Sequence, residues 1–192
     1  MSILTNNVEF KDRTIEAWTG GRDGKGVIHA TRTGYYIYKF IDPNLDLLQN
    51  RTSVHHWVIM RYAEILLSYA EAMNEAYGPT GNVGYRLNAV RALNQVRNRV
   101  GVEMPAVPTA ISKEELREKI RNERRVELAF EDHRFWDVRR WMIAEQEGVM
   151  SGAMYGIKIY WINSSPQEFR YTPYLYENRT FTKKMYLHPF ST

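Results

Sequence analysis

The stretch from Ser112 to Trp141, SKEELREKIRNERRVELAFEDHRFWDVRRW, constrains the fold more than any other part of the chain. It begins with the S-x-x-E pattern of a capping box, in which the Ser112 side chain caps the first turn and Glu115 bonds back to the cap. Ile111, just before the cap, is placed to pack on Leu116. The pattern therefore predicts a helix that starts directly after Ser112.

This helix has an apolar side that contains two carboxylates. At 100° per residue, Glu123 and Glu127 fall in the middle of the side formed by four apolar residues. These four are Leu116, Ile120, Val126 and Phe130. Each buried carboxylate needs a proton, a metal or a cation. The nearby cations are Arg124, Arg125, Arg134, Arg139 and Arg140. We therefore predict a structural ion-pair network formed by Glu123, Glu127, Arg124, Arg125, Arg134 and Asp137.

Composition limits the alternatives. With 192 residues, of which 44% are hydrophobic, the chain is long enough for one full core. Nine Lys/Arg against eight Asp/Glu between Ser112 and Trp141 indicate ion pairing, and nucleic-acid binding is not expected. The absence of cysteine excludes disulfides and thiolate sites. Without a long apolar run or a signal peptide, the chain as given is expected to be soluble and untargeted.

Two helices are predicted before this stretch, from about Trp57 to Tyr77 and from about Tyr85 to Val100. Gly78 and Gly101 stop them. Their expected inward residues are Ile59, Ala63, Leu66, Ala70, Met73 and Tyr77, then Tyr85, Ala89, Ala92, Leu93, Val96 and Val100. Small inward alanines are typical of a tetratricopeptide-like helical hairpin. A further helix is expected from His133 to about Glu145.

The two ends of the chain read as irregular or extended. Residues 1–54 are loop-rich, with glycines whose spacing does not fit a phosphate loop, a short strand near Tyr35–Phe40 and a turn at Asp42–Asn44. Residues 148–192 are tyrosine-rich, and they are predicted to form a meander over the helical body with a few short pairings. We expect one domain over residues 1–192, with the helical body at 55–147.

Several long motifs resemble one known family. They are TGYYIYKFIDP, MRYAEILLSYAEAMNE, LNQVRNRVG, EELREKIRNERRVELAFEDHRFWDVRRW and MYLHP. Together they resemble the C-terminal portion of the SusD/RagB family, which comprises glycan-capturing lipoproteins of the outer membrane of Bacteroidetes. The similarity covers about residues 33–187. The lipoprotein signal, its anchoring cysteine and the N-terminal half of the family are missing, so we expect a C-terminal fragment.

The resemblance implies a fold and a function. The implied fold is mainly α, with tetratricopeptide-like helical hairpins and long, partly extended loops and tail. The implied function is non-catalytic binding of an oligosaccharide, without a cofactor, at the outer surface of the cell outer membrane. The implied partner is a TonB-dependent outer-membrane transporter. Membrane attachment would be through a lipid anchor that this chain lacks.

No catalytic or metal site is predicted from the residues. Glu123 and Glu127, at i and i+4, point the same way from one helix, whereas the two carboxylates of a glycosidase flank the scissile bond. His133 and Asp137 have a metal-binding spacing, and His55-His56 adds nitrogens, but no further ligand stands at a recognisable spacing. A G-x-S-x-G nucleophile motif is also absent. We therefore expect no enzyme.

A glycan site needs exposed aromatic rings beside polar side chains, because a sugar offers a C–H face and hydroxyl groups. Trp18, beside Arg22 and Asp23, fits this requirement best, with Tyr35 and Tyr36 as weaker candidates. Packing in the core is the alternative role for Trp18. Trp57, Trp136 and Trp141 are expected to be structural.

A different class of function also fits the helical pattern. The predicted hairpin could act as an adaptor that binds a protein or peptide partner. A genuine N-terminus at Met1 and capture of soluble cytoplasmic proteins would favour this alternative.

Overall fold

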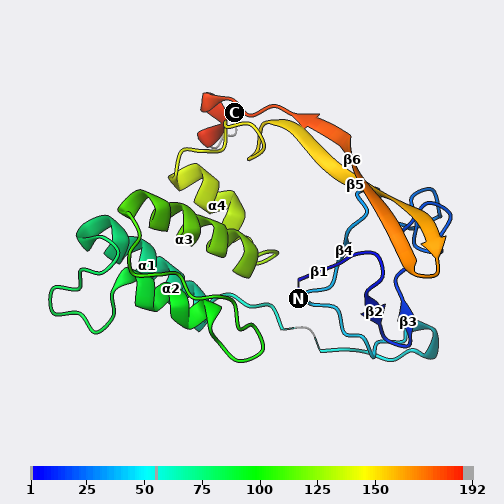
Figure 1. The fold of residues 1–192 in the computed structure, drawn as a ribbon, viewed down its shortest axis with the longest axis horizontal. Coiled ribbons are helices and arrows are strands. Elements are labelled where there is room, and N and C mark those ends of the chain that lie inside the picture. The colour runs from blue at the N-terminus through cyan, green and yellow to red at the C-terminus, as the bar shows by residue number, and fades with distance from the viewer. Residues whose placement is uncertain (1, 55, 188–192) are drawn as a thin grey trace. The chain divides into compact units, whose positions relative to one another are not determined.

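A computed structural model describes residues 2–54 and 56–187, so His55 and the last two residues of the MYLHP motif, His188 and Pro189, lie outside it. The chain divides into two compact units (Figure 1). The helical unit is Trp57–Asp137, and the β unit combines Met1–His56 with Val138–Thr192. The predicted helical body at 55–147 contains the helical unit, and a single domain over the whole chain stays a prediction.

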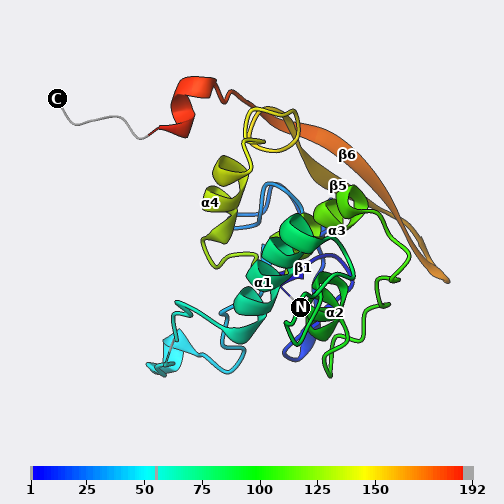
Figure 2. The same ribbon diagram turned by 90° about the vertical axis from the view of Figure 1, so that its left-hand side faces the viewer.

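The helical unit is built on α1 (Tyr62–Tyr77), α2 (Ala89–Arg97) and α3 (Lys113–Glu127), and α4 (His133–Arg140) begins in it. Both ribbon views show α1 beside α2 and α3 (Figures 1 and 2). The side chains between them form the main core. Its buried members are Leu66, Leu67, Ala70, Met73, Ala89, Val90, Ala92, Leu93, Val96, Val107, Leu116, Ile120 and Leu128.

The predicted start of α3 is confirmed. The Glu115 amide donates to Ser112 Oγ over 3.1 Å, and the Ser112 amide donates to Glu115 Oε2 over 3.0 Å. The predicted apolar side is wrong in its last turn, because Val126 and Phe130 are exposed while Leu128 is buried. Phe130 lies beyond the end of the helix at Glu127 and has a φ of 64°, so the 100° period does not apply to it. Val126 is still helical but lies on the exposed side of the last turn.

The other helices are shorter than predicted. α1 starts at Tyr62 because Arg61 is extended, with a φ of −147°, and Trp57 and Ile59 are exposed. α2 starts after Asn88, whose side chain accepts a hydrogen bond from the Arg91 amide, so the predicted inward residues at both ends of this helix are exposed. These two residues are Tyr85 and Val100. α4 ends at Arg140, well before Glu145.

The β unit has a loop-rich N-terminal segment, as predicted. Its strands have two residues each: β1 (Ile3–Leu4), β2 (Glu9–Phe10), β3 (Arg13–Thr14) and β4 (Tyr36–Ile37). β1 pairs with β4 and β2 with β3, all antiparallel. The predicted turn at Asp42 is confirmed, since the Asn44 amide donates to Asp42 Oδ1 over 2.8 Å.

The prediction of a few short pairings in the tail is wrong. β5 (Gly152–Ser164) and β6 (Gln167–Arg179) pair along their whole length as one antiparallel hairpin. Because side chains alternate along a strand, the apolar residues of β5 form a row on one face of the hairpin. That row packs on the N-terminal segment. Ile159 forms a small core with Ile15 and Ala17. Backbone bonds reinforce the contact, from the Thr19 amide to the Ile159 carbonyl and from the Ile157 amide to the Thr33 carbonyl.

A second small core closes the β unit around the end of α4. Val138 and Ala144 are buried with Phe181, which follows β6. Short 3-10 turns lie at Leu47–Gln49 and Lys183–Tyr186. The described residues form four helices and small sheets, with 29% helix and 20% strand, so the mainly α fold that the resemblance implied is confirmed only in part.

Candidate functional site

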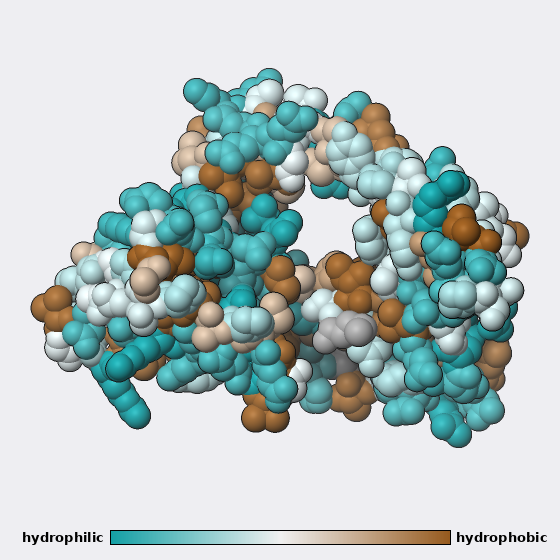
Figure 3. Space-filling view, in the orientation of Figure 1, coloured by the Kyte–Doolittle hydropathy of each residue, from teal (hydrophilic) through white to brown (hydrophobic). Residues whose placement is uncertain are grey.

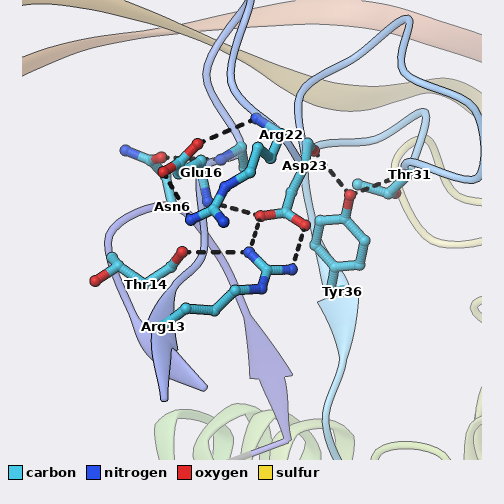
Figure 4. Close-up of polar contacts among 9 residues, drawn as sticks. Asn6, Arg13, Thr14, Glu16, Arg22, Asp23, Thr31 and Tyr36 are labelled. Atoms are coloured by element: carbon cyan, nitrogen blue, oxygen red, sulfur yellow. Dashed lines mark hydrogen bonds and ion pairs between the residues drawn. The ribbon is translucent and has the colours of Figure 1, made fainter. Parts of the chain in front are cut away.

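The polar residues predicted to bind a glycan lie in a loop of the β unit in which Asp23 accepts several hydrogen bonds (Figure 4). Arg13, on β3, donates two hydrogen bonds to the Asp23 carboxylate, over 2.6 and 2.7 Å, in a fork geometry. The Glu16 amide donates to Asp23 Oδ2 over 2.9 Å. The hydrogen bond from Arg13 is the main reason why the pKa of Asp23 lies below its ordinary value, although burial opposes this shift.

Arg22 and Tyr36 join the same cluster in Figure 4. Arg22 donates from its amide and its guanidinium to the Glu16 carboxylate, over 3.2 and 3.0 Å. The Tyr36 hydroxyl donates to the Asp23 carbonyl over 2.8 Å and accepts from the Thr31 amide over 3.2 Å. These bonds hold the loop in one shape, so the polar groups of Arg22, Asp23 and Tyr36 mainly position their neighbours.

Trp18 lies in an aromatic cluster with two residues of the tail hairpin, Trp161 and Phe169. The Trp18 ring centroid is 4.7 Å from that of Trp161, nearly perpendicular, and 5.4 Å from that of Phe169. We call these three residues the Trp18 cluster. Trp161 is 42% exposed and Trp18 is half-buried, so the cluster offers ring surface to solvent. Such a surface can stack on the C–H face of a sugar.

Trp161 and Phe169 were not predicted as site residues. They are far from Trp18 in the sequence, and only the packing of β5 and β6 on the N-terminal segment brings them together. The alternation of Ile157, Ile159 and Trp161 is the one signal that could have placed Trp161 on the packed face. Tyr35 is 44% exposed and is not part of the Trp18 cluster.

A cleft of about 540 Å³ lies at the turn between β2 and β3. Its lining combines two rings with carboxylates, an amide and an amine. These residues are Glu9, Phe10, Lys11, Asp12, Tyr38, Pro43 and Asn44. The Phe10 and Tyr38 rings meet edge to face, with centroids 6.0 Å apart. The lining is as polar as it is apolar, and the sequence did not indicate this cleft.

The helical unit contains buried ion pairs, but Glu123 and Glu127 are paired with arginines outside the predicted network. The Glu123 carboxylate accepts a hydrogen bond over 2.5 Å from Arg97, which lies on α2. Glu127 accepts from Arg61 over 2.6 Å and from Arg99 over 2.8 Å. The arginines adjacent to the carboxylates on α3 lie on other faces of the helix, so the cations come from neighbouring segments.

Other predicted members of the network are arranged differently. Arg124 donates to Asp137 Oδ2 over 2.9 Å and to Ser68 over 3.0 Å, and both members of this ion pair are buried. Arg125 is exposed and donates to Asn122. Arg134 is half-buried, and burial is the largest cause of its lowered pKa.

The carboxylates of Glu123 and Glu127 are held by guanidinium groups from neighbouring segments. Within residues 2–54 and 56–187, no group of three or more His, Asp or Glu side chains could hold a metal ion. His133 and Asp137 have the spacing of metal ligands, but no site was predicted for them. His133 Nε2 lies 3.6 Å from Glu64 Oε2 instead.

Solved structures that this chain resembles indicate the class of its fold. A SusD-like protein from Bacteroides fragilis matches 97% of this chain with a TM-score of 0.70 and 31% identity. A SusD-like carbohydrate binding protein from the same species matches 81% with a TM-score of 0.64 and 31% identity. The chain covers only 34% and 30% of these two structures.

The family follows from the sequence comparison. The profile of the SusD family matches residues 7–192, so this chain belongs to the SusD family. SusD-like protein P2 of Formosa agariphila is 35% identical over 111 residues, which are 55% of this chain and 20% of the relative. SusD-like protein P38 of the same species is 35% identical over 89 residues, or 43% of this chain and 16% of the relative. Among the described helices, none is long and apolar enough to cross a membrane.

Proposed function

We propose that this chain binds an oligosaccharide without catalysis and that the Trp18 cluster provides the stacking surface. The observation that supports the proposal most is membership of the SusD family, together with the solved relative that is described as a carbohydrate binding protein. The exposed ring of Trp161 beside Trp18 supplies the chemistry that a sugar face needs. In this proposal Arg22, Asp23 and Tyr36 shape the loop, and Tyr35 is a further candidate contact.

The wider setting is also proposed from the family. The α1–α2 hairpin would be tetratricopeptide-like, and the full-length protein would be a lipoprotein at the outer surface of the cell outer membrane. It would pass the bound oligosaccharide to a TonB-dependent transporter. The chain covers about a third of the solved relatives, so the location and the transporter partner are part of this proposal.

Calorimetric titration of the chain with a panel of neutral and acidic oligosaccharides tests the proposal. Trp18→Ala and Trp161→Ala are expected to weaken binding by about three- to tenfold each, since each removes one stacking ring. Tyr62→Ala, an exposed ring of the helical unit, is the control and should leave binding unchanged. Chromatography of the sugar after incubation should show no shorter products. Turnover, or unchanged affinity in both tryptophan variants, would count against the proposal.

The adaptor function has one observation in its favour. Two neighbouring clefts of about 410 and 470 Å³ on the α1 and α2 surface share Tyr62, Leu66 and Gln95. An apolar peptide side chain could enter them. If the panel of sugars fails to bind, while Tyr62→Ala abolishes capture of a defined peptide from a peptide library, this alternative replaces the glycan proposal.

A further inference from the structure

The second face of the β5–β6 hairpin has a composition of its own. One face carries Ile157 and Ile159, which pack on the N-terminal segment. Because side chains alternate along a strand, the intervening residues lie on the opposite face. The cross-strand pairs there are Gly156 with Tyr174, Lys158 with Thr172, and Tyr160 with Arg170. We call this surface, together with Lys25, the cationic face.

Each cation on this face lies over a tyrosine ring. Lys25 Nζ is 4.0 Å and Lys158 Nζ is 5.3 Å from the centroid of Tyr174. Arg170 Cζ is 5.1 Å from the centroid of Tyr160. These are cation–π distances. Within the described part of the chain, none of the three cations forms an ion pair with a carboxylate, in contrast to the paired arginines of the helical unit.

A hydrogen bond and a close glycine contact hold Tyr174 in this arrangement. The Tyr174 hydroxyl donates to the Arg32 carbonyl, which ties β6 to the N-terminal segment. A Cβ at Gly156 would lie 2.9 Å from Tyr174 Cε1, so the glycine makes room for the ring. In Figure 1 the blue N-terminal segment runs beside the hairpin. The Tyr174 and Tyr160 pairs are four residues apart along β5, or about 13 Å, which suits a short oligosaccharide.

Resting on the proposed glycan function, we infer that the cationic face binds acidic oligosaccharides, those that carry carboxylate or sulfate groups. Lys158, Arg170 and Lys25 would neutralise the anionic groups through charge-assisted hydrogen bonds. Tyr160 and Tyr174 would contact the sugar rings. The space-filling view shows hydrophilic and hydrophobic residues interspersed over the visible side of the β unit (Figure 3). The Trp18 cluster would stack on the sugar whether or not the sugar is charged.

Calorimetric titrations of the 192-residue chain with three tetrasaccharides of similar size provide the test. One is carboxylated (an oligogalacturonate), one is sulfated (from carrageenan) and one is neutral (maltotetraose). The double variant Lys158→Gln/Arg170→Gln is expected to weaken binding of at least one acidic sugar by about tenfold or more, because two charge-assisted contacts are lost. The affinity of the unaltered chain for that sugar should fall between 50 and 500 mM NaCl. The two acidic probes show whether carboxylate or sulfate is preferred.

Three controls make the result specific. Arg91→Gln/Lys119→Gln removes the same charges from exposed positions of the helical unit and should leave the affinity unchanged. Tyr160→Ala should weaken binding of the acidic sugar but not of a linear polyphosphate. Circular dichroism and the melting temperature of every variant should match those of the unaltered chain, because the exchanged side chains lie outside the cores.

The outcomes separate this inference from the proposed function. Equal acidic-sugar affinity in the Lys158/Arg170 variant would overturn the cationic face while leaving the Trp18 cluster in place. Binding of polyphosphate as tight as that of the sugars would also overturn it, because charge alone would then explain the attraction. Loss of all sugar binding only in Trp18→Ala and Trp161→Ala would support the proposed function and reject this face. If no sugar binds the unaltered chain, both fail.

Discussion

Arg124 and Asp137 form a deeply buried ion pair in the helical unit. Their side chains are 5% and 4% exposed, and Arg124 Nε lies 2.9 Å from Asp137 Oδ2. The pair joins α3 to the middle of α4, and Arg124 also donates to Ser68 on α1. A charge buried this deeply is stable only beside its partner, because little water is present to solvate the charge if the partner is removed.

Removing one partner should therefore destabilise the protein strongly. We expect Asp137→Asn to lower the free energy of unfolding by about 3–5 kcal/mol, since the Arg124 charge stays buried. The double variant Arg124→Met/Asp137→Leu should recover much of this loss. Urea unfolding followed by circular dichroism measures both. A double variant as unstable as the single one would show that the charge pair is not the cause.

Glu127 makes the free energy of unfolding depend on pH in the acidic range. Burial alone would raise its pKa, but hydrogen bonds from Arg99 and Arg61 outweigh burial and hold the pKa below its ordinary value of 4.5. The unfolded chain then binds the proton more readily than the folded chain does. This contribution to stability is present above pH 4.5 and is lost as the pH falls towards the folded pKa.

Glu127→Gln tests this pH dependence. At pH 7 the variant should be less stable than the unaltered chain by about 1–3 kcal/mol, because the hydrogen bonds to a charged acceptor are weakened. The difference should shrink between pH 5 and pH 3, when urea unfolding is repeated at each pH. Glu118→Gln, on the exposed side of α3, is the matched control and should show little change at any pH. A constant difference across this range would contradict the explanation.

At the level of elements, Gly34 decides how closely the N-terminal segment approaches β5. It has a φ of +84°, and a Cβ there would lie 2.5 Å from both Ile157 Cγ2 and the Ile157 carbonyl oxygen. The neighbouring Thr33 carbonyl accepts the hydrogen bond from the Ile157 amide. Only glycine fits both the backbone angle and the space.

Gly34→Ala should therefore separate these two elements. Gly26→Ala is the control, because its φ is +103° and no atom lies within 4 Å of its Cβ. We expect the Gly34 variant to lose about 1–3 kcal/mol more than the control, since steric overlap adds to backbone strain. Unfolding followed by circular dichroism measures both losses. Equal losses in the two variants would mean that the approach to Ile157 does not matter.

At the level of the whole molecule, the two units differ in continuity. The helical unit is one segment, Trp57–Asp137, and holds the largest core. The β unit needs both ends of the chain, because Ile15 and Ala17 pack on Ile159. Folding of the β unit therefore depends on contacts that are distant in sequence.

Expression of Trp57–Asp137 by itself should yield a folded domain. We expect helical circular dichroism and a cooperative thermal transition, because every member of its core lies within the segment. Met1–His56 expressed alone should show neither, since it lacks the β5–β6 hairpin. Circular dichroism at 222 nm during heating checks both fragments. A non-cooperative transition in the helical fragment would show that it depends on the β unit.

The sequence by itself determined the features that depend on near neighbours. The capping box of Ser112 and Glu115, the helical stop at Gly78 and the turn at Asp42 are local in the chain, so pattern alone specifies them. The stop predicted at Gly101 is wrong, because α2 already ends at Arg97. The need for cations beside Glu123 was also visible, because burial of a carboxylate has a general energetic consequence.

Only the tertiary structure decided the partners. It supplied Arg97 to Glu123, paired β5 with β6 along their full length, and set Trp161 against Trp18. It also exposed Val126 and Ile59, which periodicity had placed inside. The reason is physical: a helical or strand period says which residues share a face, but which segment covers that face depends on contacts between residues far apart in the chain.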